Sequence, residues 1–274
     1  MTVAVAWVRK VKNCEELVFA SDSRLCGGHR WDECPKLMML PGNCAVMAFA
    51  GDTGYAYPLM MQINYAMAEY ERIRSRAMNL SDINGHVLNH LNHLIQSVYN
   101  SVDPDGMNDN EFLLGGYSWV EKRFIIWRYY YVKSCSAFQK TKAEKHILHS
   151  VSGNIMVIGD KKEELKREIR RLLNEKEPQS THLDMEPFQA LCNLLKNAHS
   201  SDTIGGAPQI IKAYQYMNTR PVGVYWPYKG KDDFENRTLL GRKLFEYEDT
   251  DFWFIDPKSM QVNSCLKNKQ DKLS

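Results

Sequence analysis

The sequence has no long apolar run, no marked excess of one charge and no CxxC pair. None of its apolar stretches approaches the roughly 20 residues of a membrane-spanning helix, and its start lacks the basic and apolar regions of a signal peptide. Its 35 basic and 33 acidic residues leave a net charge of +2. Charge therefore gives no reason to expect nucleic acid or a membrane as the main partner.

Cysteine usage points to a reducing compartment. The cysteines are odd in number and scattered: Cys14, Cys26, Cys34, Cys44, Cys135, Cys192 and Cys265. This pattern argues against a disulfide framework and against a zinc site, so we expect a cytoplasmic protein without a metal or other cofactor. The chain has 274 residues, of which 44% are apolar, and it is long enough for one large domain core.

Two hairpins are predicted near the start of the chain. Residues 2–8 are almost continuously apolar, as in a strand covered on both faces, and a second strand over 17–22 follows a polar connection. A turn near Lys12 would place Thr2 beside Asp22, in a register good to a residue or two. The second hairpin, with strands over 36–40 and 44–50, brings Lys36 back toward Gly51.

The rest of the chain predicts alternating groups of helices and strands. Helices are expected over 55–76, 81–100, 161–174 and 185–198, with Ser81 as an N-cap. Strands are expected over 112–119, 123–132, 155–158, 209–216, 221–225, 239–247 and 251–255. Residues 103–111 and the basic segment 133–154 are interpreted as loops, and the polar tail from 258 as frayed. This order is typical of an α+β fold with antiparallel sheets covered by helices.

Thr2 carries the case for an enzyme, because removal of Met1 would make it the first residue. A free N-terminal threonine supplies its own base, since an α-amine has a pKa of about 7.7–8.0 and can accept the hydroxyl proton. A nearby ammonium would lower that pKa further. The hairpins supply Lys36 as the ammonium, Asp22 as its counter-ion and an N–H of the Gly51 turn for an oxyanion.

Each of these residues also has an ordinary structural role. Threonine after the initiator methionine is common, Asp22 could be a turn residue, Lys36 a solvated strand-edge charge, and Gly51 a turn with positive φ. Taken alone, each ordinary role is the more frequent one. Together, in a register that brings them to one end of the sheet, these residues favour a site.

The same residues resemble a known family. In order and spacing they are similar to the successive motifs of proteasome β-subunits, of the peptidase in the bacterial two-component ATP-dependent protease, and of Anbu-type bacterial homologues. The matching segments are Thr2, Ala20-Ser21-Asp22-Ser23-Arg24, Pro35-Lys36-Leu37 and Ala48-Phe49-Ala50-Gly51-Asp52-Thr53. The resemblance is specific over 2–76, weaker to about 225, and absent beyond that point.

The resemblance implies a four-layer αββα sandwich of the N-terminal-nucleophile hydrolase type, here with extra C-terminal strands. We expect one such domain over 2–225, a C-terminal β extension of it over 226–257, and a flexible tail over 258–274. Threonine peptidase activity and assembly into a homo-oligomeric ring or a related oligomer are also implied. Ordinary methionine removal would expose the nucleophile without self-cleavage.

The resemblance assigns the nucleophile and base to Thr2, the carboxylate to Asp22, the lysine to Lys36 and the oxyanion-hole amide to Gly51. A peptide or protein substrate would lie as an added strand between the Cys26 segment and the Gly51 segment. The residues implied in substrate binding are Cys26, Ala48 and Thr53. Some members of the family work with an ATP-dependent unfoldase, which makes such an enzyme a candidate partner.

Two positions depart from the family pattern. Gly159-Asp160-Lys161 stands where the family usually has Gly-Ser-Gly, so that the serine which helps to poise the amine is replaced by a carboxylate or lost. The family also has an aspartate followed three residues later by Ser or Thr, whereas here Gly205 follows Asp202 at that spacing. Asp202 is retained as a supporting catalytic residue, and Asp160 is a weaker candidate.

Three functions stay open at this point. The first is an amide hydrolase, a peptidase that uses Thr2. The second is a catalytically decayed proteasome-like assembly or interaction module, which the two departures and the extra strands favour. The third is a small-molecule amidase on the same fold.

Two further signals have ordinary explanations. His86, His90 and His93 recur at helical spacing and could form one edge of a metal site, but no Glu or Cys joins them in that stretch. Polar histidines on a helix face are therefore the favoured interpretation. The mixed-charge run over 161–171 is typical of a solvated helix face or of a contact between subunits in a ring.

Overall fold

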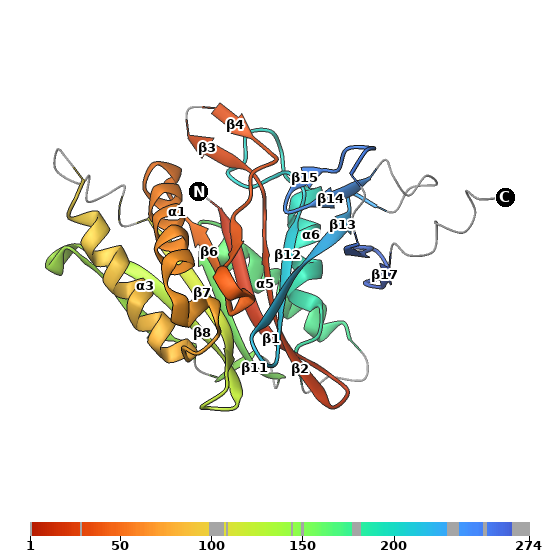
Figure 1. The fold of residues 1–274 in the computed structure, drawn as a ribbon. Helices are drawn as coiled ribbons and strands as arrows, with labels where there is room; N and C mark the ends of the chain where they lie inside the picture. The colour runs from red at the N-terminus through yellow and green to blue at the C-terminus, as the bar shows by residue number, and fades with distance from the viewer. Residues whose placement is uncertain are drawn as a thin grey trace.

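The structure is a computed structural model that describes residues 2–27, 29–98, 107, 109–143, 145–148, 151–176, 182–228, 236–248 and 251–264. Its strands form two principal sheets and one short hairpin (Figure 1). The strands of the larger sheet are β1 (Val3–Val11), β2 (Cys14–Ser21), β10 (Lys145–Leu148), β11 (Val151–Gly159), β12 (Gln209–Tyr214), β13 (Asn218–Tyr225), β14 (Arg237–Leu239), β15 (Arg242–Lys243), β16 (Trp253–Ile255) and β17 (Val262–Ser264). They are ordered β10-β11-β1-β2-β12-β13-β14-β15, and β16 pairs with both β13 and β17.

The second sheet has five strands in chain order. They are β5 (Leu37–Met39), β6 (Ala45–Ala50), β7 (Glu111–Ser118), β8 (Arg123–Val132) and β9 (Ala137–Lys142), while β3 (Leu25–Gly27) and β4 (His29–Trp31) form the separate hairpin. Two short 3₁₀ turns, η1 (Pro41–Asn43) and η2 (Lys133–Cys135), follow β5 and β8. The β3–β4 hairpin follows β2 and precedes β5 in the chain, so it links the two sheets.

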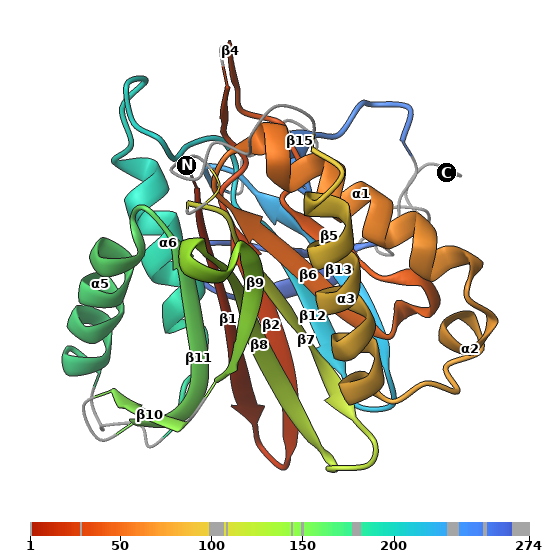
Figure 2. The same ribbon diagram turned by 90° about the vertical axis from the view of Figure 1, so that its left-hand side faces the viewer.

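Helices lie on both sides of the paired sheets. Figure 2 shows α5 (Lys162–Asn174) and α6 (Glu186–Lys196) on one side, and α1 (Thr53–Glu69) and α3 (Leu80–Ile95) on the other. The short helix α2 (Glu71–Arg74) follows α1. None of the helices in the described residues combines the length and the apolar character needed to cross a membrane. The molecule is thus a mixed α/β structure with helices outside and sheets inside.

The alternation of side chains along β1 explains how this packing arises. Val3 and Val5 belong to the apolar cluster under α5 and α6, whereas Ala4 and Ala6 belong to the cluster between the two sheets. All four side chains are fully buried. The prediction of a strand covered on both faces is confirmed, and the small alanines allow the second sheet to approach closely.

The first hairpin has a register one residue away from the predicted one, because Ala4 pairs with Ser21. The shift lies within the stated tolerance, and the N–H of Asp22 donates to the carbonyl of Val3 at 3.3 Å. In the second hairpin Leu37 pairs with Ala48, as expected. The first hairpin therefore brings the start of β1 to Asp22, and the second brings Lys36 to the end of β6, as the sequence predicted.

The prediction of one helix over 55–76 was wrong, because the chain is extended at Tyr70 (φ −88°, ψ 105°). The break separates α1 from α2. Ile73 lies six residues after Met67, a spacing that would turn its side chain off the buried face of a continuous helix. After the break Ile73 is 1% exposed and packs in the core.

The prediction of Ser81 as an N-cap was also wrong, since Asn79 precedes the first turn of α3 and makes no capping hydrogen bond. Its side-chain oxygen instead accepts a hydrogen bond from the hydroxyl of Ser118 at 3.2 Å. A tertiary contact to β7 thus replaces the local cap. Among the described residues α3 reaches Ile95, short of the predicted end near 100.

The segment 133–154 is not a loop in its described residues: it forms η2, β9, β10 and the first part of β11. Phe138 explains part of the error, because this apolar residue in a basic stretch is 2% exposed and extends the core under α3. The predicted frayed tail contains β17. The tail from 265 onward, and most of the predicted loop over 103–111, lie outside the described residues.

Candidate active site

Thr2 lies buried at the start of β1, where the turn after β11 holds its main chain. The N–H of Asp160 donates to the carbonyl of Thr2 at 3.1 Å, while the Asp160 side chain is exposed. Gly159 has a φ of +99°, and a Cβ on it would lie 1.9 Å from the Thr2 carbonyl oxygen. Only glycine permits this approach. The N–H of Gly159 in turn donates to the buried carboxylate of Glu111 at 3.0 Å.

Asp22 follows the last residue of β2, and its carboxylate is held by main-chain donors. Oδ1 accepts from the N–H of Val3 at 3.1 Å. Oδ2 accepts from the N–H groups of Arg24 and Gly205, at 3.1 and 3.2 Å. These bonds fix the orientation of a fully buried side chain and help to satisfy its charge.

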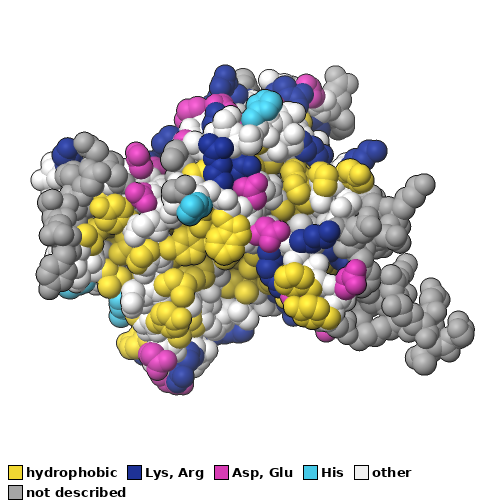
Figure 3. All heavy atoms as spheres, turned by 90° about the horizontal axis from the view of Figure 1, so that it is seen from above, with side chains coloured by type: hydrophobic (Ala, Val, Ile, Leu, Met, Phe, Trp, Pro, Cys, Tyr) yellow, Lys and Arg dark blue, Asp and Glu magenta, His cyan; other side chains and the backbone are white. Residues whose placement is uncertain are grey.

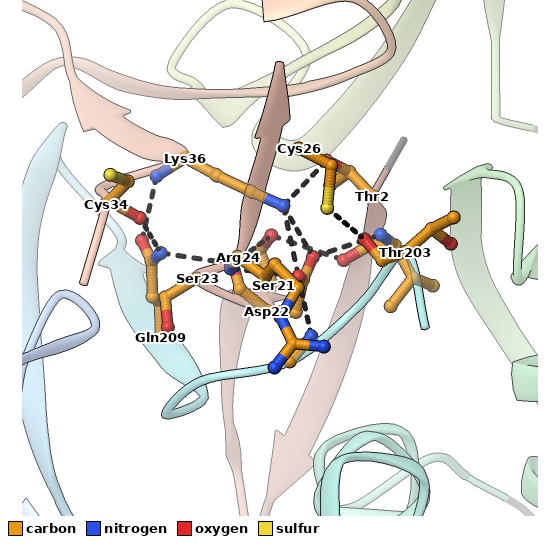
Figure 4. A network of polar contacts seen from close by, with 12 residues as sticks. Thr2, Ser21, Asp22, Ser23, Arg24, Cys26, Cys34, Lys36, Thr203 and Gln209 are labelled. Carbon is orange, nitrogen blue, oxygen red and sulfur yellow. Dashed lines mark hydrogen bonds and ion pairs between the residues drawn. The ribbon is translucent and has the colours of Figure 1, made fainter. Parts of the chain in front are cut away.

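Lys36 precedes β5 and reaches across to the larger sheet. Its Nζ donates to Oγ1 of Thr2 at 2.7 Å and lies 2.9 and 3.0 Å from the two carboxylate oxygens of Asp22 (Figure 4). All three side chains are 0% exposed. Burial lowers the pKa of Lys36, and the charge of Asp22 partly offsets that effect. The lysine is therefore a donor aimed at the threonine hydroxyl and shielded from bulk water.

The residues predicted to bind substrate flank this centre on two segments. Gly51 follows the last residue of β6 and has a φ of +124°, and a Cβ on it would lie 2.5 Å from the carbonyl oxygen of Asp109. Ala48 is fully buried between the sheets. A Cβ on Gly27 would lie 2.9 Å from Oγ1 of Thr53, so the end of β3 lies beside the start of α1.

Cys26 occupies the middle of β3, and its Sγ lies 3.8 Å from the carbonyl oxygen of Thr203 (Figure 4). The thiol is half-buried. In Figure 4 it lies near Thr2 and the end of the Lys36 side chain. The structure thus brings together Thr2, Asp22 and Lys36, and the contact that it gives for the Cys26 thiol is to Thr203.

The carboxylate of Asp202 lies in a turn before Gly205, where it accepts from the N–H of His199 at 2.7 Å. The carbonyl of Asp202 accepts from Nη1 of Arg24 at 3.1 Å. A Cβ on Gly205 would lie 2.3 Å from Cζ of Arg24. The guanidinium therefore fills the space that a serine side chain at 205 would need.

The sequence did not mark Gln209 as a site residue. Its buried amide contacts the main chain at both Asp22 and Lys36. One signal was available, because Gln209 opens a predicted strand and shares a face with the apolar Ile211, which points between the sheets. A polar residue at such a position needs partners, and here they belong to the site.

The histidines on α3 bond to their own helix. Nδ1 of His90 lies 2.8 Å from the carbonyl oxygen of His86, and Nδ1 of His93 lies 2.7 Å from that of Asn89. In the portion of the chain described, no cluster of three or more His, Cys, Asp or Glu side chains could hold a metal ion.

The face seen from above carries hydrophobic side chains with Lys, Arg, Asp and Glu among and around them (Figure 3).

Sequence comparison finds no family profile that matches the chain and no curated protein that resembles it closely enough to count as a relative. Comparison of structures does give matches, and these are to Anbu proteins, whose fold the chain shares. Anbu from Hyphomicrobium sp. strain MC1 matches with a TM-score of 0.54 and 15% identity, over 80% of this chain and 87% of that one.

Two further solved structures give the same result. Anbu from Yersinia bercovieri, described as an ancestral β-subunit, matches with a TM-score of 0.54 and 17% identity, over 80% of this chain and 86% of its own. A Gly-1 mutant of the Hyphomicrobium protein matches with a TM-score of 0.51 and 16% identity, over 78% and 82% of the two chains. The chain thus has the fold of Anbu, as the motifs of its first 76 residues predicted.

Proposed function

We propose that the chain is a threonine-type amide hydrolase, a peptidase, that uses Thr2 as its nucleophile once removal of Met1 makes Thr2 the first residue. The observation that carries the proposal is the 2.7 Å contact of Lys36 Nζ with Thr2 Oγ1, within a buried ion pair to Asp22. The fold shared with Anbu supports it. We also propose that the fold is a four-layer αββα sandwich.

In the proposed reaction the α-amine of Thr2 takes the hydroxyl proton as Oγ1 attacks the carbonyl carbon of the substrate. Lys36 donates to Oγ1, which stabilises negative charge there and keeps the pKa of the amine low. Collapse of the tetrahedral intermediate breaks the C–N bond, and the amine proton passes to the leaving nitrogen. Water, activated by the same amine, then hydrolyses the ester at Oγ1 and restores Thr2.

The peptide in this proposal lies as an added strand between β3 and the end of β6. The N–H of Gly51 faces the oxyanion, and the specificity pocket lies near Thr53 and near Ala48, which is buried behind it. The two segments meet where Gly27 lies beside Thr53, which marks one end of the proposed peptide position. Asp202 supports the centre indirectly, through the turn that also positions the N–H of Gly205.

The family resemblance extends the proposal to assembly and location. We propose a homo-oligomeric ring or related assembly in the cytoplasm, acting on peptides or unfolded proteins delivered by an ATP-dependent unfoldase. The free cysteines among the described residues, for example Cys34 and Cys192, suit a reducing compartment. The oligomeric state is open to direct measurement by light scattering.

Intact-mass spectrometry tests the proposed nucleophile. The purified protein should lack Met1, and an electrophile directed at N-terminal threonine should add once, with the label mapping to Thr2. A panel of peptides and acyl amides then separates a peptidase from a small-molecule amidase. Thr2→Ala is the matched control, and it should abolish labelling and turnover while leaving the assembly intact.

The proposal is wrong if protein verified to start at Thr2, and correctly assembled, shows neither turnover nor labelling. That result would favour the second candidate, a decayed proteasome-like interaction module. The observation behind this candidate is the guanidinium of Arg24, which occupies the place of a family serine side chain at Gly205. Retention of full biological activity by Thr2→Ala would support it.

A further inference from the structure

We propose that Gln209 is a positioning residue that fixes Lys36 relative to Asp22, and that the β14–β15 turn of the C-terminal extension braces it. An effect of Gln209 on catalysis depends on the proposed function. The hydrogen bonds of Gln209 do not depend on it, because they join the two sheets whether or not Thr2 is a nucleophile. If the β14–β15 turn braces Gln209, the C-terminal extension contributes to the catalytic unit.

The relation between Asp22 and Lys36 needs an explanation, since the residues come from different sheets. Asp22 follows β2 of the larger sheet, while Lys36 precedes β5 of the second sheet. The chain between them leaves the core to form the β3–β4 hairpin. Strand pairing within either sheet therefore cannot set the distance from Lys36 Nζ to Asp22, and a contact across the sheets must do so.

The side-chain amide of Gln209 supplies such contacts, beside a main-chain bond from the N–H of Cys34 to the carbonyl oxygen of Ser23 at 3.1 Å. Its Oε1 accepts from the N–H groups of Lys36 and Leu37, at 3.0 and 3.4 Å. Its Nε2 donates to the carbonyl oxygens of Asp22 and Cys34, at 3.1 and 2.7 Å (Figure 4). One amide thus uses both protons and its acceptor oxygen on the main chain that flanks the ion pair.

No other type of side chain of this size could do the same. A glutamate carboxylate would accept from the N–H groups but would face the two carbonyl oxygens without a proton to donate. A leucine would leave these buried groups without partners. Gln209 itself is 0% exposed, so water cannot replace the lost bonds without entering the core.

The β14–β15 turn packs directly behind this amide. Gly241 in the turn has a φ of +88°, and a Cβ on it would lie 2.4 Å from Cβ of Ser23 and 3.2 Å from Nε2 of Gln209. The preceding Leu240 packs against the core between the sheets. The turn therefore limits how far Gln209 and Ser23 can move away from the site.

Gln209→Leu and Gln209→Glu test the amide. Both should slow labelling of Thr2 by a threonine-directed electrophile by about tenfold to a hundredfold at saturating probe, because misplacement by about 1 Å costs that much. Asn84→Leu is the matched control: Asn84 is another buried amide, bonded to the hydroxyl of Tyr129 at 2.7 Å. It should lower the Tm while leaving the labelling rate within about twofold.

Gly241→Ala tests the brace, and Gly42→Ala is its control. Gly42 also has a positive φ, +74°, and a Cβ on it would lie 2.7 Å from the carbonyl oxygen of Ile73, in the η1 turn at the other end of β5. Both variants should lose stability. Only Gly241→Ala should also slow labelling, by several-fold.

A crystal structure of Gln209→Leu separates failure of this inference from failure of the proposed function. The distance from Lys36 Nζ to Thr2 Oγ1 should increase from 2.7 Å to beyond hydrogen-bond length. An unchanged distance would overturn the positioning role, whether or not the wild type reacts. If the wild type is not labelled but the distance increases in Gln209→Leu, the proposed function fails and the positioning role of Gln209 is supported. Labelling of both Gln209 variants at the wild-type rate also overturns the inference.

Discussion

The guanidinium of Arg24 lies over Gly205, so that a Cβ on the glycine would be 2.3 Å from Cζ of the arginine. Asp32 holds the guanidinium there, with Nε and Nη2 donating to its two carboxylate oxygens at 2.6 and 2.8 Å. This geometry explains why position 205 carries no side chain. The glycine and the arginine depend on one another.

Gly205→Ser should therefore destabilise the protein instead of restoring the family pattern. Overpacking of this kind costs about 1–3 kcal/mol, and the displaced Arg24 would release the turn that holds Asp22. We expect a lower Tm and slower Thr2 labelling. Gly85→Ser is the control, because nothing lies within 4 Å of a Cβ on that helical glycine; its stability should be unchanged or raised. Equal behaviour of the two variants would contradict the steric argument.

The buried ammonium of Lys36 makes a prediction about alkaline pH. Burial lowers its pKa in the folded protein, so between that pKa and the unfolded value of about 10.4 the unfolded chain binds more protons. Below the folded pKa, the buried charge of Lys36 lowers the free energy of unfolding by its full amount. This loss disappears as the pH rises through the folded pKa toward the unfolded value, so the free energy of unfolding increases with pH. Urea titrations from pH 7 up to the unfolded value of about 10.4, compared with Asp22→Asn/Lys36→Met, should show wild type gaining on the double variant as the pH rises. A difference that stays constant over that whole range would contradict a lowered pKa of Lys36.

Sequence alone located the core of this site because local pairing sufficed. The hairpins that carry Thr2, Asp22 and Lys36 are close in the chain, and an error of one residue in register still left Thr2 beside Asp22. The partners of these residues were harder to foresee. Gln209 pairs with Ser21 across 188 positions of sequence, and no local pattern reports such a contact.

Two errors in the fold have different origins. Polar composition made 133–154 resemble a loop, yet β9 and β10 extend the two sheets through strand pairing that does not require apolar residues throughout. Asn79 bonds to Ser118 instead of capping its helix. In the first case pairing with a strand adjacent in the chain decides the structure, and in the second a side chain 39 positions away does so.

Thiol reactivity offers an independent test of packing. Cys14 and Cys135 are exposed and should be alkylated first at pH 8. Burial raises the pKa of the Cys44 thiol to about 11 and also raises the pKa of Cys34 and Cys192, and a neutral thiol is a poor nucleophile. Peptide mapping after a short alkylation should find these three unmodified. Modification of Cys192 as early as Cys14 would contradict the packing of α6.

The carboxylate of Glu111 supports Thr2 from a distance, because it accepts from the N–H of Gly159 at 3.0 Å and pairs with Arg128. Glu111→Ala should cost about 2–4 kcal/mol, from a buried N–H without an acceptor and an arginine without its partner; the 31% exposure of Arg128 keeps the figure below that of a fully buried pair.

Glu111→Gln keeps an acceptor for Gly159 and should cost about 1 kcal/mol. Both values come from urea unfolding. Labelling of Thr2 should slow in the alanine variant and recover substantially in the glutamine variant, because the turn that holds the Thr2 carbonyl is loosened only in the first. Glu121→Ala, which removes a surface partner of Arg123, should change stability by less than about 1 kcal/mol and leave labelling unaltered. An alanine variant at 111 that behaves like the one at 121 would show that Glu111 does not position Thr2.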